Sequence, residues 1–292
     1  YVRGGFWRNF LVKYPESNHM QKKMLWVSGK VWQAEEKIPK AAFEKAKNNL
    51  WAGQCNCPYW HGIFGGAYLP HLRHANFQHL ITAGRIVDEA VRLRREWVDC
   101  RVLDYDADGR DEILLESRRL NLYFTTMGGR LFELDDRRLG INFLNMMNRR
   151  EEGYYRKLVE LGDQGGQTSD QVSSIHNTVS VKEEGLEKYL ITDWYQRGSF
   201  IDHFLHAKTT LNDFAHCQYG EQGDFVNQPY GFKWEQKGNQ AVLTMERLGN
   251  VWIEGKEQVP ILLKKMVSLI PARPEFEVSY TIQNKGNQPI QL

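Results

Sequence analysis

The chain has 292 residues, enough for one large domain or two of ordinary size. Hydrophobic residues make up 41% of it and charged residues 25%, which is typical of a globular protein with a buried core. The net charge of +2 excludes a strong field for attracting nucleic acid or a membrane surface, and no apolar run reaches the roughly 20 residues of a transmembrane helix. We therefore expect neither nucleic acid nor a membrane as a partner.

Apolar residues at spacings of three and four predict a helical subdomain over residues 1–98. Its expected helices run over Glu16–Val31, Pro39–Leu50 and Ala75–Trp97. Lys22, Lys23 and Lys30 lie off the apolar face of the first of these helices. We expect these three lysines to be solvated.

After residue 98 the pattern changes to short alternating runs separated by Gly, Asn and Asp, which predicts antiparallel strands. The clearest runs are Ile113–Leu115, Leu120–Thr125, Arg130–Leu134, Ala241–Arg247, Val251–Glu254, Lys264–Ile270 and Phe276–Asn284. We expect them to form a large β-sandwich domain over residues 99–292, which makes the fold class α+β. Gly162–Ser174 holds almost no large apolar side chain and predicts a mobile loop or linker.

The stretch QCNCPYWHGIFGGAYLPHLR (Gln54–Arg73) lies between the second and third predicted helices. Pro58 and the glycines prevent a continuous helix, so the chain must turn here. Trp60 offers a flat apolar ring and His61 a titratable donor and acceptor. Sugars suit that pair, because their C–H faces stack on aromatic rings while their hydroxyls need polar partners. A tight loop pinned into the core by its aromatic side chains would explain the same residues equally well.

An alternating acidic run follows the predicted helices. Its carboxyl groups belong to Asp104, Asp106, Asp108, Asp111 and Glu112. Such alternation puts oxygen atoms on one side of a tight loop, Gly109 allows the sharp turn, and oxygen ligands suit Ca²⁺. We expect a structural calcium loop that is not an EF-hand, because Leu115 stands where an EF-hand has glutamate. The alternative is a solvated acidic turn. No organic cofactor is expected.

Three other groups of polar residues are weaker indicators of a functional site. Arg149–Glu151 contains an arginine pair, which we expect to form a salt bridge between domains rather than to contact substrate. Asp202 and His203 point to opposite faces of an extended chain, so we expect no dyad between them and assign His203 an interdomain hydrogen bond. Glu133 and Asp135 share one face of a predicted strand, and we expect them to face solvent.

The four cysteines, at positions 55, 57, 100 and 217, match neither a zinc motif nor a disulfide framework. They predict reduced thiols in a cytoplasmic protein, with metal binding at Cys55 and Cys57 a remote alternative.

The stretch around Trp60 resembles a characteristic motif of glycoside hydrolase family 57, the α-amylase and 4-α-glucanotransferase group. Other segments resemble this family in the same order along the chain. They are GGFWRNFLVKYPESNHMQKKM (Gly4–Met24), DYDADGRDEILLES (Asp104–Ser117), GGRLFELD (Gly128–Asp135), NRREEGYY (Asn148–Tyr155) and SFIDHFL (Ser199–Leu205). The resemblance implies a helical segment beside the sugar cleft of an incomplete (β/α) barrel, then a mutarotase-like supersandwich that we expect to be incomplete at its C-terminal end.

The resemblance also implies roles for individual residues. Trp60 would line the glucan subsites, with Tyr59 beside it, and His61 would hold the loop in place. Some members of the family carry Asp-Ala where this chain has Cys57 and Pro58, so any sugar contact made by that Asp is absent here. The family's His-Gln-Pro strand end, Glu nucleophile and Asp general acid match no segment of this sequence, so we predict no catalytic residue.

The predicted function is therefore that of the C-terminal portion of a retaining enzyme that cleaves or transfers α-1,4-glucosidic bonds. We expect this portion to be inactive alone, with an α-glucan or maltooligosaccharide and the missing N-terminal catalytic barrel as its partners. The alternative is a stand-alone, non-catalytic carbohydrate-binding or structural module.

Overall fold

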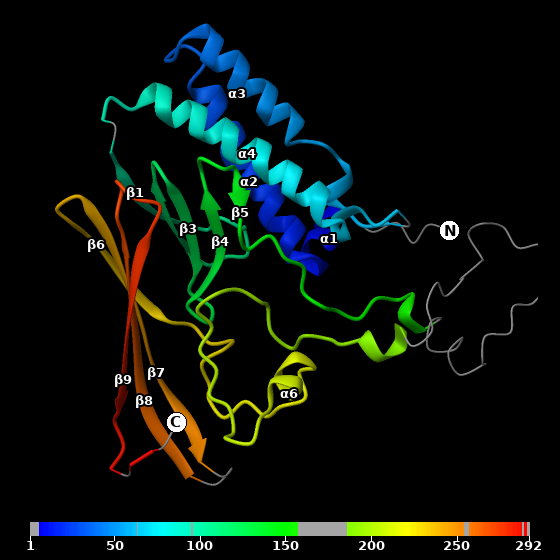
Figure 1. The fold of residues 1–292 in the computed structure, drawn as a ribbon, viewed down its shortest axis with the longest axis vertical. Coiled ribbons are helices and arrows are strands. Elements are labelled where there is room, and N and C mark those ends of the chain that lie inside the picture. The colour runs from blue at the N-terminus through cyan, green and yellow to red at the C-terminus, as the bar shows by residue number, and fades with distance from the viewer. Residues whose placement is uncertain are drawn as a thin grey trace, which may run out of the picture. The chain divides into compact units, whose positions relative to one another are not determined.

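The computed structural model describes residues 6–62, 64–94, 96–156, 186–253, 257–287 and 289–290. Helices come first and two antiparallel sheets follow, which confirms the predicted α+β class (Figure 1). The chain divides into two compact units. The first consists of Tyr1–Met147, Gly198–Phe204 and Glu221–Leu292, and the second of Asn148–Arg197 and Leu205–Gly220. The domain boundary at residue 98 stays a prediction, and the predicted loop Gly162–Ser174 lies outside the described residues.

The first unit begins with four helices, α1 (Trp7–Lys13), α2 (Pro15–Gln33), α3 (Lys40–Ala52) and α4 (Pro70–Val91). Of these, α2, α3 and α4 share an apolar core that includes Val31, Leu50 and Leu80. Proline begins α2 and α4, where its missing N–H leaves no hydrogen bond unmade. The prediction missed α1 and misplaced both ends of α4, which begins earlier, at Pro70, and ends earlier, at Val91. Across the described ranges, no helix combines the length and apolarity needed to cross a membrane.

The first sheet has five antiparallel strands in chain order. They are β1 (Val98–Leu103), β2 (Glu112–Ser117), β3 (Leu120–Thr125), β4 (Arg130–Asp136) and β5 (Ile141–Asn142). Both faces of β2 and β3 are buried. Leu115 and Leu122 join a core shared with the second sheet, while Leu114 and Tyr123 join a cluster with Trp26 of α2. The central strands therefore lie between helices and a sheet.

A β-bulge in β4 determines which of its side chains face the helices. Tyr123 pairs with Glu133, but the next residue, Phe124, pairs with Leu131, so Phe132 has no partner on β3. The Phe132 ring stacks on His19 of α2, with ring centroids 4.6 Å apart. The bulge thus keeps Leu131 in the core between the sheets and lets Phe132 face α2.

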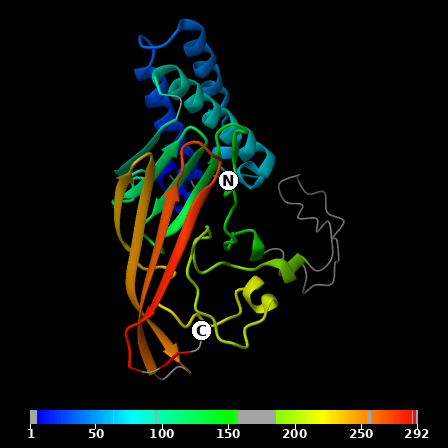
Figure 2. The same ribbon diagram turned by 60° about the vertical axis from the view of Figure 1, so that its left-hand side comes forward.

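The second sheet has four antiparallel strands with long pairings (Figure 2). They are β6 (Gly231–Lys237), β7 (Gln240–Ile253), β8 (Glu257–Leu269) and β9 (Phe276–Asn284). Its inner side chains, among them Leu243 and Ile261, meet those of the first sheet, which confirms the predicted sandwich. The predicted break between Arg247 and Val251 is wrong, because Gly249 and Asn250 stay in register with β8.

A buried lysine links the two sheets. Lys265 of β8 is fully buried, and its Nζ lies 2.7 Å from Oδ2 of Asp202. The same Nζ donates to the carbonyl oxygens of Phe200, at 2.6 Å, and of Gly128, in the turn between β3 and β4, at 3.3 Å. Tyr230 donates its hydroxyl hydrogen to Asp202. An unpaired charge here would cost several kcal/mol, so these contacts specify how the sheets meet.

The second unit is organised around a buried carboxylate. Its described elements are η3 (Leu186–Tyr189) and α6 (Leu211–Ala215). Asp193 accepts hydrogen bonds from Arg149 Nε at 2.9 Å, Arg149 Nη2 at 2.6 Å and Arg197 Nε at 2.9 Å. Arg149 Nη1 also donates to the carbonyl of Ala215 at 2.6 Å. The structure thus gives Arg149 an ion pair inside this unit, and its interdomain role stays a prediction.

Candidate functional site

The chain between α3 and α4 forms two short 3₁₀ turns, η1 (Cys57–Tyr59) and η2 (Gly66–Tyr68). We call residues 54–69 the Trp60 loop. Trp60 stands between the two turns in extended conformation, and its side chain is 39% exposed. Trp60 therefore offers part of its indole to a ligand at the surface of the loop.

Two glycines are required for the position of Trp60. A side chain at Gly62 would collide with the Trp60 indole, so the bare backbone of Gly62 lies against that ring. Gly66 has φ of +52°, and a side chain there would collide with the Trp60 carbonyl. That carbonyl accepts a hydrogen bond from the Ala67 amide at 2.7 Å. The loop therefore closes tightly behind an indole whose remaining face is accessible.

Tyr59 and His61 lie on the inner side of the Trp60 loop. Tyr59 is 7% exposed, packs with Met20 of α2, and donates its hydroxyl hydrogen to the Gly53 carbonyl at 2.5 Å. Burial raises the pKa of Tyr59 well above its ordinary value, so the hydroxyl stays protonated. The His61 ring packs edge-on against Tyr68, 4.7 Å between centroids, and its Nδ1 is 3.4 Å from the Gly65 carbonyl. Sugar contact by either residue stays a prediction, and both brace the loop.

Side chains of α4 tie the loop to the rest of the first unit. Arg73 is buried and donates from Nη1 to the Ala67 carbonyl at 2.5 Å and from Nε to Oδ1 of Asn145 at 2.7 Å. Asn76 Nδ2 donates to the Cys55 carbonyl at 3.2 Å. The four cysteines are free thiols, and Cys55 is exposed. Sequence reasoning passed over Arg73, because the predicted helix began at Ala75 and left Arg73 in the loop.

The acidic run forms a tight loop between β1 and β2. Ligand oxygens of Asp104, Asp106 and Asp108 all lie within 4.8 Å of one another. The Asp104 carboxylate accepts the amides of Asp108, at 3.0 Å, and Gly109, at 3.1 Å. Asp106 Oδ2 is 3.2 Å from Nε2 of His19 on α2. The structure therefore gathers three of the five predicted ligands at a surface loop next to α2.

The other two predicted ligands, Asp111 and Glu112, lie outside that group of three. Asp111 is exposed, whereas Glu112 is almost completely buried. Glu112 Oε2 accepts the amides of Tyr105 at 3.0 Å and Asp106 at 3.4 Å. Burial, together with the negative charge of Asp106, raises the pKa of Glu112 to about 8. Glu112 thus supports the acidic loop from beneath.

The pair Glu133 and Asp135 is buried, so the expectation that it faces solvent is wrong. Lys23 of α2, also expected in solvent, is buried between them, and its Nζ contacts Glu133 Oε1 and lies 2.6 Å from Asp135 Oδ2. Asn121 Nδ2 donates to Asp135 Oδ2 at 2.7 Å. Burial and the charge of Asp135 raise the pKa of Glu133 to about 8, although Lys23 opposes the shift.

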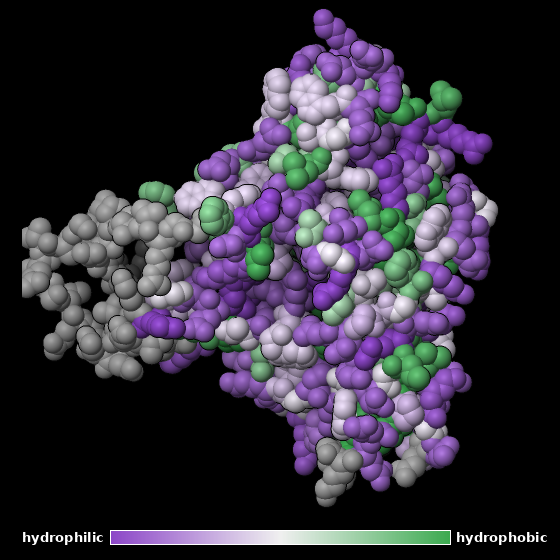
Figure 3. Space-filling model, turned by 180° about the vertical axis from the view of Figure 1, so that it is seen from behind, coloured by the Kyte–Doolittle hydropathy of each residue, from purple (hydrophilic) through white to green (hydrophobic). Residues whose placement is uncertain are grey.

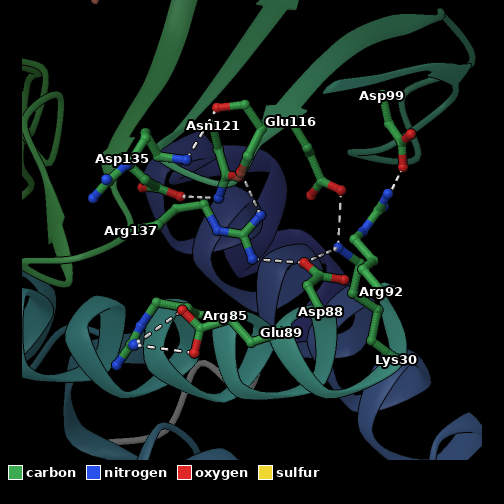
Figure 4. Close-up of polar contacts among 12 residues, drawn as sticks. Lys30, Arg85, Asp88, Glu89, Arg92, Asp99, Glu116, Asn121, Asp135 and Arg137 are labelled. Carbon is green, nitrogen blue, oxygen red and sulfur yellow. Dashed lines mark hydrogen bonds and ion pairs between the residues drawn. The ribbon is translucent and has the colours of Figure 1, made fainter. Parts of the chain in front are cut away.

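The same interface continues toward the end of α2 with a second set of ion pairs (Figure 4). Lys30 Nζ lies 2.8 Å from Oε2 of Glu116 on β2 and 3.4 Å from Oδ2 of Asp88 on α4. Arg137 Nη2 donates to that Asp88 oxygen at 2.6 Å. Although burial opposes it, the charges of Lys30 and Arg137 hold the pKa of Glu116 well below its ordinary value. These carboxylates are occupied by cations and face no ligand.

Asp202 and His203 do not pair with each other, as predicted from their alternation. Asp202 contacts Lys265, whereas His203 Nδ1 is 2.7 Å from Oε2 of Glu221. Glu221 uses its other oxygen to accept the Phe204 amide at 2.7 Å. All these residues belong to the first unit, so an interdomain role for His203 stays a prediction.

Comparison with known proteins relates the chain to one family along most of its length. Residues 104–292 match the family model described as α-amylase/4-α-glucanotransferase, C-terminal. Residues 5–87 match the model for the middle domain of the same enzymes. The two models thus cover the helices and the sheets in the order in which the chain presents them.

Individual relatives agree with this match. Alpha-amylase 1 of Dictyoglomus thermophilum is 36% identical over 293 residues, which cover 100% of this chain and 39% of that protein. The 4-alpha-glucanotransferase of Thermococcus litoralis is 35% identical over 273 residues, 92% of this chain and 37% of that protein. The crystal structure of that glucanotransferase superposes with a TM-score of 0.77 at 32% identity, covering 98% of this chain and 39% of the other. The chain therefore spans about two fifths of the length of these relatives.

The buried Glu133 predicts a pH-dependent stability. Folding raises its pKa from 4.5 to about 8, so between these values the folded protein binds more protons than the unfolded one, and the free energy of unfolding falls as the pH rises. Between pH 6 and 8, the free energy of unfolding should fall less in Glu133→Gln than in the unmodified chain, by up to about 2 kcal/mol. Urea unfolding at several pH values measures it.

The exposed Glu277 provides the control, since Glu277→Gln should leave the pH profile unchanged. Glu112 contributes a fall of the same sign, so some slope should remain in Glu133→Gln. An unaltered slope in Glu133→Gln would show that Glu133 is already ionised at pH 6.

Proposed function

The chain belongs to the α-amylase/4-α-glucanotransferase family, and from this premise we propose that its helical part lends Trp60 to a site that binds α-glucan. The exposed indole of Trp60 carries this proposal, because it stands between two 3₁₀ turns and is backed by Gly62. A ring fixed in advance binds a sugar face with little loss of conformational entropy. The matches to the two family models confirm the resemblance that the sequence suggested.

The reaction of the whole protein would be cleavage or transfer of α-1,4-glucosidic bonds with retention of configuration. Retaining enzymes need two carboxyl groups about 5 Å apart that reach the sugar. Glu133 and Asp135, the pair that alternates on β4, are buried against Lys23 and cannot do so. The reacting carboxyl groups would therefore come from a catalytic barrel that partners this portion, and these 292 residues alone would bind glucan without turning it over.

The acidic loop would hold a structural calcium ion. Asp104, Asp106 and Asp108 supply hard oxygen donors close enough together to share one ion, which is the donor type that Ca²⁺ prefers. Glu112 would support this loop through backbone amides, without binding the ion itself. Because Asp106 also contacts His19, the ion would brace the junction between α2 and the first sheet. No step of glucan chemistry would pass through it.

The free cysteines support a cytoplasmic location for the protein, since oxidising compartments favour disulfides.

Trp60→Ala should weaken binding of maltoheptaose to the chain, because the sugar loses the ring on which it stacks. We expect an affinity loss of about fivefold or more at this site, corresponding to about 1 kcal/mol. Isothermal titration calorimetry of the purified chain measures it. Phe64→Ala is the matched control, because Phe64 is 88% exposed in the same loop and has no role in the proposed site. Unchanged affinity in a folded Trp60→Ala variant would remove Trp60 from the site.

Calcium should raise the midpoint of thermal unfolding, because an ion bound only by the folded loop stabilises the folded state. Asp104→Asn combined with Asp108→Asn should abolish the increase, whereas Asp136→Asn, outside the loop, should preserve it. Differential scanning fluorimetry with excess chelator and with added CaCl₂ measures the effect. Equal midpoints in both conditions would identify the loop as a hydrogen-bonded acidic turn.

A further inference from the structure

A second group of exposed aromatic side chains lies on the outer surface of α2 and α3. Its exposed members are Trp32 at the end of α2 and Trp51 on α3. The buried ring of Phe43 and the side chain of Lys47 lie at intervals of four residues before Trp51 along α3. We call these four residues the α2–α3 stripe. Trp32 is 46% exposed and Trp51 is 52% exposed, which is unusual for the largest apolar side chain. Neither residue takes part in the Trp60 loop.

The rings of the α2–α3 stripe are held in place by contacts with one another. Phe43 is 5% exposed and belongs to the helical core, and Trp32 packs edge-on against it with centroids 5.8 Å apart. Lys47 Nζ lies 5.2 Å from the Phe43 centroid and 5.1 Å from that of Trp51. The two exposed indoles are therefore anchored to a buried ring through a π contact on one side and a cation on the other.

The surface beside the stripe is open at Gly29, and the lysine of the stripe is neutralised by an ion pair. Gly29 lies one helical turn before Trp32, and a side chain placed there would meet no atom within 4 Å. Lys47, the charged residue of the stripe, is paired with the neighbouring Glu44, its Nζ 2.7 Å from Oε1. Figure 3 shows pale and green residues among purple ones over the helices. Such a surface suits an uncharged ligand that has both apolar faces and hydroxyl groups.

The stripe has the length and the position of a track for a chain molecule. Phe43 and Trp51 are eight residues apart, about 12 Å along the helix axis. Trp51 is the second-last residue of α3, and the Trp60 loop begins three residues later, at Gln54. The stripe thus runs along α3 toward the site already described. A small sugar would need only one ring, whereas a polymer can use both Trp32 and Trp51.

We propose that the α2–α3 stripe is a second α-glucan-binding site, which holds long glucan chains through Trp32 and Trp51 outside the cleft served by Trp60. The proposal rests on the proposed function, because both sites take the same class of ligand. The indoles stack on glucose rings, and Lys47 and Glu44 hydrogen-bond the hydroxyl groups. Long chains would be retained near the Trp60 loop in this way between successive encounters with it.

Native gels containing amylopectin test the proposal with the 292-residue chain. The double variant Trp32→Ala, Trp51→Ala should be retarded at least about fivefold less strongly than the unmodified chain. Trp234→Ala is the matched control, because Trp234 is 42% exposed on β6 and should leave retardation unchanged. Circular dichroism verifies that each variant is folded. Phe43 stays unchanged throughout, because its removal would damage the helical core.

Comparison with Trp60→Ala in the same gels separates the two proposals. Loss of retardation in the double variant, with retardation retained in Trp60→Ala, supports the α2–α3 stripe whatever the role of Trp60. Full retardation of the double variant with loss in Trp60→Ala overturns the stripe and leaves the proposed function intact. The stripe is also overturned if sedimentation shows that the double variant turns a dimer into a monomer without changing retardation, since a second copy of the chain would then occupy this surface.

Discussion

Buried polar contacts join α2 and α4 to the first sheet, and the contact of Lys23 with Glu133 and Asp135 is the most deeply buried of them. Burial of any one of these charged groups without its partner would lower the stability of the folded state by several kcal/mol. Any shift of α2 along the sheet would separate Lys23 from both acids, so the position of α2 is closely specified. Met20 of α2 packs against Tyr59 of the Trp60 loop. The contacts that fix α2 on the sheet therefore also help to position the Trp60 loop.

Much of the fold could be predicted from periodicity, because helices and strands repeat apolar residues at different intervals. The burial of β4 could not be predicted this way. Glu133 and Asp135 alternate with apolar neighbours, and that pattern is the same whether the polar face meets water or a helix carrying a lysine. The continuity of β7 could not be predicted for a similar reason. Gly249 and Asn250 indicate a turn from the local sequence, but in the folded chain they pair with β8.

The candidate site could be predicted in part. The glycines of the Trp60 loop and the acids of the calcium candidate are local patterns, so the sequence located both loops correctly. It could not separate the roles of neighbouring residues, because burial depends on partners far along the chain. Tyr59 turns inward against α2, whereas Trp60 stays 39% exposed. For the same reason the exposure of Trp32 and Trp51 could not be predicted, because in a helical pattern both resemble core residues.

The most direct measurement is a titration of the chain with maltoheptaose, followed by nuclear magnetic resonance of the tryptophan indole N–H groups. The chain has nine tryptophans, which can be assigned by substituting them one at a time. The account predicts that the Trp60 resonance shifts in a saturable way, while that of Trp97, which is buried beside β1, does not move. A Trp60 resonance that stays in place at saturating sugar would contradict the claim that this chain lends Trp60 to glucan binding.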